Sequence, residues 1–403
     1  MGVLNTPQKP LSSKSSRMTS ILTRLSFIGF VTALSSRCVD PIIPQIAEGL
    51  LTNPAKVALL STAFALPFAL IQPILGPLAD MVGKIRVMVL CLAVLVIASL
   101  VCGLATNFSV LFTARVIAGM ATGGIFPVGL ALIGDLVPIK DRQVALGRWL
   151  IVILTGNLLG ASVAGVINDL LGWRAVFLVI AGGGLAVFLL AAFTLRGAAR
   201  EHRPTFNLRN IPAGYIGIFK NPRAKVCYGA VFIEGLAIFG LFPFVALLLL
   251  AAGEARASIA GLVLGGFSLG GVIYSAFVSL LLNRFKVETL MLIGGLLSAL
   301  TMALIAFEFS WPIQFVAFTV LGFAFFLLHG SMQVQATELS ETARGAATSL
   351  HAFFFFMGQA SGPVLFGLGL VTIGAGPSIA IGAAIMALLG LVCWRFFQKT
   401  AAA

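Results

Sequence analysis

Long apolar runs alternate with short polar segments along almost the whole chain of 403 residues. A helix rises about 1.5 Å per residue, so about 20 mostly apolar residues are needed to cross the hydrocarbon core of a bilayer. Twelve runs reach this length, and each predicts a transmembrane helix. Their limits are 21–46, 55–79, 86–106, 108–136, 146–168, 174–195, 225–252, 257–282, 288–307, 312–337, 346–370 and 377–397.

One long polar connection, residues 196–224, lies between the sixth and the seventh run and divides the chain into two sets of six. We therefore predict an all-α membrane protein in which twelve transmembrane helices form two pseudo-symmetric six-helix bundles. Its parts are then a cytoplasmic N-tail at 1–20, an N-terminal bundle at 21–195, a cytoplasmic loop at 196–224, a C-terminal bundle at 225–397 and a cytoplasmic C-tail at 398–403.

The two halves look like copies of one another, because residues of the same kind recur 202 or 203 positions apart. A constant offset across several helices predicts two fused repeats, a common construction among transporters. The matching pairs are Gly156 and Gly358, Gly160 and Gly362, Gly165 and Gly367, Gly119 and Gly322, Phe64 and Phe267, and Asp135 and Glu338.

Composition supports the membrane class and excludes several others. Hydrophobic residues make up 59% of the chain and charged residues 10%, against about a quarter charged in soluble domains. The five cysteines are scattered, so we expect neither a disulfide framework nor a metal site. No nucleotide-binding loop and no hydrolase motif is present in the sequence. We therefore expect no cofactor, no enzymatic activity and no ATP-driven pump.

The net charge of +13 reflects orientation in the membrane. With the N-terminus inside, 21 of the 26 Lys and Arg residues fall on the inner segments, as the positive-inside rule requires. Both termini are therefore predicted to be cytoplasmic, in a bacterial-type inner membrane. Because the bases fall in loops and form no binding block, we expect no nucleic-acid partner.

The turn GPLADMVGKIRV, residues 76–87, carries three charges between two apolar runs. Asp80 lies at the C-terminal end of its helix, where the helix dipole disfavours an acid. It should therefore have another partner, which could be Lys84, Arg86 or the positive N-terminus of a neighbouring helix. A solvated turn on the positive side of the membrane is the alternative, but it leaves the misplaced acid unexplained.

This turn resembles the loop-two signature of the major facilitator superfamily, G-x-L-A-D-R-x-G-R-K. Met81 and Ile85 depart from that signature, and Lys84 keeps the charge of its first base after the second glycine. The resemblance covers residues 20–397. The matching residues are Gly76, Leu78, Ala79, Asp80 and Gly83.

The resemblance implies a cytoplasmic gate at this turn. In the family, the aspartate engages the N-terminal end of helix eleven, and the base four residues later pairs with an acid at the end of helix four. Here those roles would fall on Asp80, Lys84 and Asp135, with Gly76 and Gly83 shaping the turn. This set would lock the two halves together on the cytoplasmic side.

Charged residues inside the spans of the first half are candidates for a cavity. A charge within a transmembrane helix is expensive and is usually paired or functional. Arg115 resembles the helix-four arginine of the superfamily; outward snorkelling is the alternative. By helical rise, Arg37 and Asp40 lie about 20 and 24 Å above Arg24, in the outer half. The D-x-x-x-P-x-I-A spacing that begins at Asp40 resembles the helix-one motif of drug:proton antiporters; a local Arg37–Asp40 pair near the headgroups is the alternative.

The second half contributes Glu234 and His329. Glu234 lies about 15 Å above the cytoplasmic start of its span, near the middle of the bilayer, and we predict that it carries the coupled proton, with a structural buried role as the alternative. His329 lies about 12 Å from the cytoplasmic end of its span. A hydrogen-bonded core role is slightly favoured for this histidine over a role in the cavity. Asp40 is expected to form a charge pair with Arg115 or Arg37.

These features predict a secondary transporter that moves a small organic molecule across the inner membrane by alternating access. Its resemblance to the drug:proton antiporters implies proton-coupled export. The exporters' helix-five pattern is incomplete, since Ala161 stands where a proline is expected. A proton symporter or facilitator for uptake is therefore the alternative, and a membrane-embedded enzyme or receptor is a distant one. The expected partners are the substrate, protons and lipid, and the expected state is a monomer.

Overall fold

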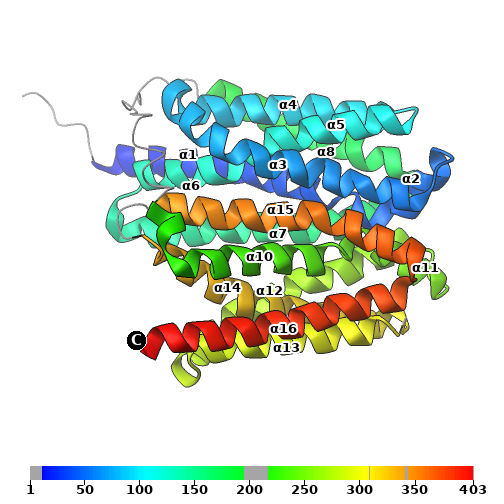
Figure 1. The fold of residues 1–403 in the computed structure, drawn as a ribbon. Coiled ribbons are helices and arrows are strands. Elements are labelled where there is room, and N and C mark those ends of the chain that lie inside the picture. The colour runs from blue at the N-terminus through cyan, green and yellow to red at the C-terminus, as the bar shows by residue number, and fades with distance from the viewer. Residues whose placement is uncertain (1–10, 195–216, 308, 341–343, 403) are drawn as a thin grey trace, which may run out of the picture.

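The structure, a computed structural model, describes residues 11–194, 217–307, 309–340 and 344–402, and within these ranges every regular element is helical. Twelve of its helical segments are long and apolar enough to cross a membrane, which confirms the twelve predicted spans. They run side by side along one direction (Figure 1).

The helices divide into two sets that follow one another along the chain. The first set is α1 (Leu11–Arg37), η1 (Asp40–Ile42), α2 (Ile43–Gly49), α3 (Pro54–Val82), α4 (Lys84–Leu104), α5 (Phe108–Gly123), α6 (Ile125–Leu136), α7 (Ile139–Leu171) and α8 (Trp173–Thr194). The second set is α10 (Pro222–Phe239), η4 (Phe242–Phe244), α11 (Val245–Ala251), α12 (Ala257–Arg284), α13 (Val287–Ile305), α14 (Trp311–Thr337), α15 (Arg344–Thr372) and α16 (Ala375–Ala402).

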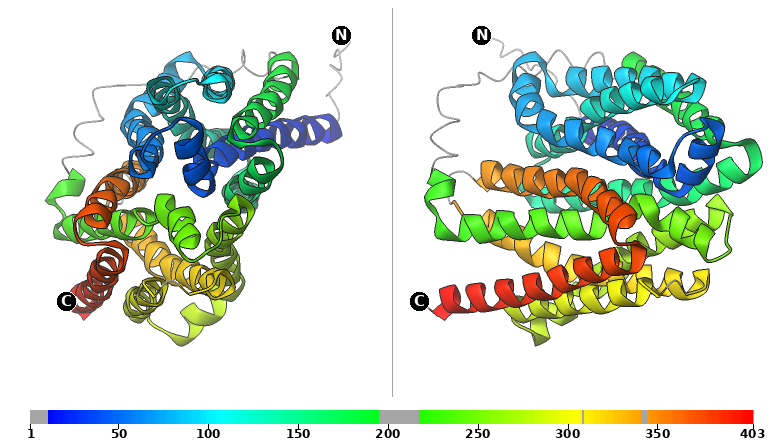
Figure 2. Two further views of the ribbon diagram at one scale, coloured as in Figure 1. Left: turned by 90° about the vertical axis from the view of Figure 1, so that its right-hand side faces the viewer. Right: turned by 45° about the vertical axis from the view of Figure 1, so that its right-hand side comes forward.

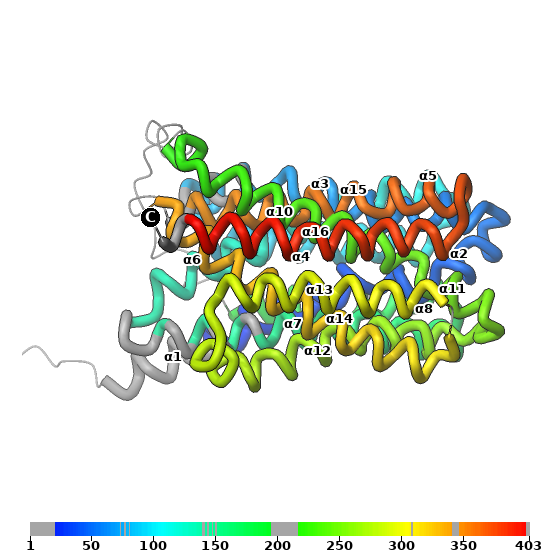
Figure 3. Tube along the Cα trace, turned by 60° about the horizontal axis from the view of Figure 1, so that its bottom comes forward, coloured from blue at the N-terminus to red at the C-terminus, as the bar shows by residue number. Residues whose placement is uncertain are grey.

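The two sets form two bundles that lie against each other, as the view along the helices shows (Figure 2). The start of α1 and the end of α16 lie at one end of the molecule, which we call the terminal end (Figure 1). The short helices α2 and α11 lie at the opposite end, which we call the far end (Figures 1 and 3). Large apolar clusters fill the interior of each bundle.

The predicted repeats are confirmed by their packing. Gly119 of α5 lies so close to α3 that an added Cβ atom would be 2.2 Å from the carbonyl oxygen of Phe64. In the second bundle, Gly322 of α14 approaches Phe267 of α12 in the same way, with a corresponding distance of 1.9 Å. The same glycine therefore makes the same helix–helix contact in both halves.

The first span of each bundle is interrupted at the same point. The run predicted at 21–46 is divided into α1, η1 and α2, and its counterpart into α10, η4 and α11. Pro41 and Pro243, 202 residues apart, each lie in the first turn after the interruption, where a proline removes a backbone donor and ends the preceding helix. Each break leaves backbone carbonyl groups without partners inside their helix.

The two bundles are in direct backbone contact toward the far end. An added Cβ on Gly165 of α7 would lie 2.2 Å from the carbonyl oxygen of Ala257, and one on Gly261 of α12 would lie 2.4 Å from that of Ala161. Small residues allow helices to approach this closely. The interface between α7 and α12 is therefore a close fit of two backbones.

An acid from the first bundle also holds the end of a helix in the second. The carboxylate of Asp169, near the end of α7, accepts hydrogen bonds from the backbone N–H groups of Ala257 and Ser258, at 3.0 and 2.9 Å. These are among the first N–H groups of α12, which have no partner within their own helix. We call this contact the far-end latch.

Candidate functional site

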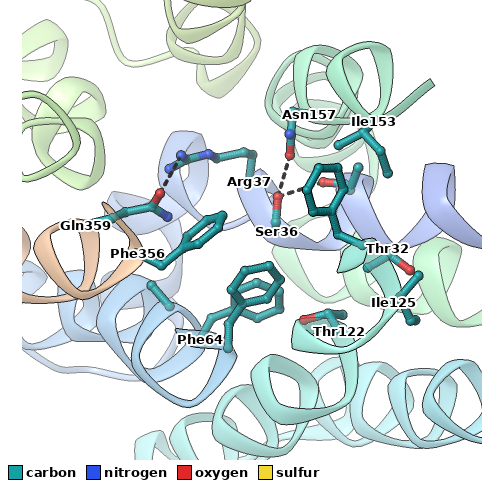
Figure 4. Close-up of a pocket in the computed structure, with 14 residues that line it drawn as sticks. Thr32, Ser36, Arg37, Phe64, Thr122, Ile125, Ile153, Asn157, Phe356 and Gln359 are labelled. Atoms are coloured by element: carbon teal, nitrogen blue, oxygen red, sulfur yellow. Dashed lines mark hydrogen bonds between the residues drawn. The ribbon is translucent and has the colours of Figure 1, made fainter. Parts of the chain in front are cut away.

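A cavity of about 150 Å³ lies mainly within the first bundle and is closed on one side by α15 of the second (Figure 4). One part of its lining is aromatic, and another part carries hydroxyl and amide groups. The lining residues are Thr32, Ala33, Ser36, Arg37, Phe64, Ala65, Phe68, Thr122, Ile125, Phe126, Ile153, Asn157, Phe356 and Gln359.

Arg37, the last residue of α1, is placed at the cavity by the break in the first span. Its Nη1 lies 3.6 Å from Oδ2 of Asp40, and its Nη2 donates to Oε1 of Gln359 on the opposite bundle at 3.3 Å (Figure 4). Both distances exceed the 2.7–2.9 Å of a strong charge-assisted bond. The shortest contact of Asp40 is instead a 2.6 Å hydrogen bond from Ser61. Arg37 is thus held loosely by two partners at once.

The same guanidinium group lies over two rings of the second bundle. The Cζ atom of Arg37 is 4.5 Å from the ring centre of Phe239 and 5.1 Å from that of Phe242. Cation–π contacts of this length are favourable in a desolvated interior. Arg37 therefore lies against the second bundle, and its i,i+3 ion-pair partner Asp40 is buried.

Arg115 is buried in α5 and, of the two bases expected as partners of Asp40, it is the one that does not form the ion pair. Its Nη1 donates to the backbone carbonyl of Ser35 at 3.0 Å, and its Cζ lies 4.3 Å from the ring centre of Phe64. The Ser35 carbonyl belongs to the last turn of α1, where helix carbonyls lack partners and attract a cation. Among the described residues, Asp40 has its ion pair with Arg37, and the Nε and Nη2 atoms of Arg115 have no hydrogen-bond partner.

Glu234 and His329 meet inside the second bundle. The Oε2 atom of Glu234, on α10, lies 2.9 Å from Nδ1 of His329 on α14, and the Glu234 side chain is fully buried. Its second oxygen, Oε1, has no hydrogen-bond partner in the described part of the chain. The His329 ring stacks on Phe325 and touches the ring of His351, with centres 4.8 and 5.0 Å apart. His329 is therefore the direct partner of the deepest acid.

The residues predicted for the gate lie at the terminal end. Lys84, at the start of α4, forms an ion pair of 2.5 Å with Asp135 at the end of α6. Gly83 has a φ of 109° between α3 and α4, a conformation that only glycine adopts readily. Asp80 and Gly76 fall in the last two turns of α3, at positions outside those whose side chains the structure describes.

The family follows from a comparison of the whole chain with known families. The model of the Major Facilitator Superfamily matches residues 25–253 and 227–402. This chain belongs to the Major Facilitator Superfamily. Its fold and its family are those of membrane transporters.

Several relatives in the superfamily have names that refer to drugs. The multidrug export protein EmrB of Escherichia coli K12 is 30% identical over 196 residues, which are 49% of this chain and 38% of EmrB. The multidrug transporter protein MdtP of Bacillus subtilis is 30% identical over 205 residues, 51% of this chain and 38% of MdtP. Multidrug resistance protein 1 of B. subtilis is 24% identical over 362 residues, 89% of this chain and 90% of that protein. The chain thus spans about two fifths of the length of the first two and most of the third.

A solved structure has the same fold over the full length. A bacterial homologue of the human lysosomal transporter Spinster, in an inward-facing and unoccupied conformation, aligns with a TM-score of 0.75 and 20% identity. The alignment covers 98% of this chain and 99% of that one. The superfamily fold, with twelve helices in two pseudo-symmetric bundles, is therefore shown for this protein.

The sequence did not single out most of the cavity lining of this superfamily member. Asn157 and Gln359 are equivalent residues of the two repeats, 202 positions apart, and both face the cavity. Asn157 accepts a hydrogen bond from Ser36 at 2.6 Å, whereas Gln359 accepts one from Arg37 (Figure 4). An amide recurring at the repeat offset was a signal that could have identified both.

Proposed function

We propose that this protein is a proton-coupled secondary transporter that exports small organic molecules across the inner membrane by alternating access. The observation that carries the coupling is Glu234, a fully buried acid in contact with His329 near the middle of its span. Ionisable groups buried within a membrane are conspicuous candidates for proton transfer.

A proton-driven carrier needs an acid whose surroundings change between its two main states. One oxygen of Glu234 contacts His329 and the other is unpartnered among the described residues. Entry of water between the helices would give that oxygen partners and change the balance between the neutral and the charged carboxyl group. Rearrangement of the two bundles would then load and release one proton in each cycle.

Orientation and direction are parts of the same proposal. The excess of Lys and Arg at the terminal end supports a cytoplasmic position for both termini. The far-end contacts would then close the outer side, and Asp80, Lys84 and Asp135 would lock the cytoplasmic side in the alternative state. The names of the multidrug relatives support export. A monomer remains the expected state.

Uptake by proton symport is a second candidate, and Arg37 favours it. This guanidinium group lines the cavity and would attract an anion. A bound anion and a bound proton have opposite charges, so each favours binding of the other. Such a carrier would move both in the same direction.

Transport by the purified protein in sealed vesicles tests the proposal. With the vesicle interior acidic, an exporter that is oriented inside out should accumulate its substrate as protons leave, whereas a symporter should release substrate with them. A gradient of one pH unit supports accumulation of about tenfold at one proton per molecule. Drug-sized organic molecules labelled with a radioisotope supply the assay. Substrate movement with no response to a pH gradient of either sign would contradict proton coupling.

The proposed topology is tested with single cysteines. Lys56 lies at the far end and Lys399 at the terminal end, and both side chains are exposed. A membrane-impermeant maleimide added to intact cells should label Lys56→Cys and leave Lys399→Cys unlabelled until the cells are opened. The five native cysteines are buried, so their background should be low. Labelling of Lys399→Cys on intact cells would reverse the orientation. Arg203, in the predicted cytoplasmic loop, lies outside the described residues. A cysteine at this position should be labelled only from the cytoplasmic side, like Lys399→Cys.

A further inference from the structure

The cavity of this transporter carries a positive charge that its surroundings do not fully balance. Among the described residues that line it, Arg37 is the one with a charged side chain. The acid nearest to Arg37 is Asp40, which is not part of the lining and lies 3.6 Å away, with its shortest hydrogen bond to Ser61. A molecule in the cavity would therefore meet the guanidinium group and not the carboxylate.

A second buried cation increases this imbalance. Arg115 is 1% exposed, stacks on the lining residue Phe64, and has two nitrogen atoms without a hydrogen-bond partner in the described structure. The first bundle thus places two arginines, Arg115 fully buried and Arg37 partly buried, against one acid in this region. A buried charge that is not fully paired is unfavourable, and a bound anion would offset it.

Glu234 of the second bundle does not supply the missing partner. Its carboxylate contacts His329, and no ion pair with either arginine is present among the described residues. The charged residues of the first bundle and the Glu234–His329 pair of the second therefore form two separate clusters. The anion that would balance the first cluster has to come from outside the chain.

The rest of the lining defines the body of the ligand. Phe64, Phe68 and Phe356 form an aromatic wall, in which the ring centres of Phe68 and Phe356 lie 4.4 Å apart in an edge contact. This cavity has a volume of about 150 Å³. In another protein, an apolar cavity of about 150 Å³ binds benzene. Aromatic rings prefer edge or offset contacts with further rings. The cavity in this state therefore fits one aromatic ring.

Polar groups beside Arg37 would complete the recognition of a planar anionic group. Gln359 reaches the same guanidinium from the opposite bundle, and its amide could turn to donate to a carboxylate oxygen. Arginine binds carboxylates through two parallel hydrogen bonds. Because its contacts to Asp40 and Gln359 are long, the Arg37 guanidinium group can still form such a pair of bonds with a ligand.

We propose that the cavity binds a monocyclic aromatic carboxylate, with its carboxylate on Arg37 and its ring against Phe64, Phe68 and Phe356. This inference rests on the proposed transport function in either direction of movement. It assigns the substrate an anionic class that the names of the multidrug relatives do not state.

The test compares three ligands that differ mainly in charge. Benzoate, benzamide and benzylamine have one ring each and are, at neutral pH, negative, neutral and positive. We expect saturable binding of radiolabelled benzoate to the purified full chain. Benzamide should compete at least about tenfold less well, since it lacks the charge-assisted bond, and benzylamine less still. Equal competition by benzamide, or stronger competition by benzylamine, would overturn the proposal.

Matched variants locate the binding. Arg37→Gln should weaken benzoate binding at least about tenfold and leave weak binding of benzamide unchanged. Arg256→Gln makes the same change at an exposed site at the far end and should bind benzoate as the wild type does. Asp40→Asn removes the competing carboxylate and should bind benzoate at least as tightly. Unchanged binding in Arg37→Gln, or an equal loss in Arg256→Gln, would contradict the assignment.

Folding and transport are checked separately. Benzoate should raise the melting temperature of the wild type and of Asp40→Asn but not that of Arg37→Gln, and the unliganded melting temperatures should be similar. If Arg37→Gln does not fold, the competition among benzoate, benzamide and benzylamine in the wild type and the benzoate affinity of Asp40→Asn still test the proposal. A protein that transports other solutes but does not bind benzoate would refute this inference alone. Vesicles that move no solute would refute the proposed function.

Discussion

Replacement of Glu234 by glutamine should abolish accumulation of substrate against its gradient and leave downhill exchange intact. Glutamine has nearly the same shape and keeps one oxygen that can contact His329, but it cannot bind and release a proton. Under a gradient of one pH unit, the accumulation ratio should fall from about tenfold in the wild type to about one. The measurement is radiolabelled substrate uptake into vesicles, with and without the pH gradient.

Glu48→Gln is the matched control for this variant. It makes the same chemical change at an exposed acid of α2, at the far end, and should leave the accumulation ratio unchanged. Exchange of labelled for unlabelled substrate without a pH gradient reports whether Glu234→Gln still folds and cycles. If Glu234→Gln accumulates substrate as well as the wild type, the proton is carried elsewhere, and Asp40 is the next buried acid to test.

Loss of the far-end latch should open the far end. Asp169→Ala removes both hydrogen bonds to the N–H groups of Ala257 and Ser258 and leaves the helix end of α12 uncapped. Caps and charges at helix ends contribute about 1–2 kcal/mol. The ratio of far-end-open to far-end-closed molecules should therefore rise about five- to thirtyfold. Distances between spin labels at Lys56 and Phe307, on the far ends of the two bundles, measure this ratio.

Glu254→Gln tests whether the effect depends on the link between the bundles. Glu254 lies close to the same end of α12, but it bonds with Arg256 within its own bundle. Those bonds lower the pKa of Glu254 to about 2, so this acid is charged at any working pH. The variant should leave the distance distribution unchanged. A shift as large as that of Asp169→Ala would mean that any charge at this helix end sets the equilibrium, which contradicts a latch.

The fold was largely predictable from the sequence because a bilayer allows few solutions. Twelve apolar runs of sufficient length and a constant repeat offset lead to two six-helix bundles. The interruptions of α1 and α10 were not predicted, although Pro41 and Pro243 recur at the repeat offset. An apolar run has the same hydropathy whether its helix is continuous or broken, so hydropathy alone could not reveal the breaks.

Contacts within the candidate site depend on helix rotation, which composition does not determine. Glu234 and His329 were placed separately at about 15 and 12 Å from the same membrane face, and these similar depths were an unused indication that they meet. The contact between Arg37 and Gln359 joins residues 322 positions apart, across two bundles. Gln359 reaches Arg37 because α15 packs against α3 of the first bundle, and this packing cannot be read from composition.

The contact of Arg37 with Phe239 and Phe242 bears on how the two halves diverged after duplication. At the repeat offset of 202, Phe239 occupies the position of Arg37 in the second half, and Phe242 that of Asp40. Arg37 therefore lies against its own counterpart in the other half, as residues near a pseudo-twofold axis do. In an ancestor with two identical halves, arginine at this position would have faced a second arginine, and the two like charges would have repelled each other. With an aromatic ring in the second copy, the single guanidinium group has a ring face to lie on in place of a like charge.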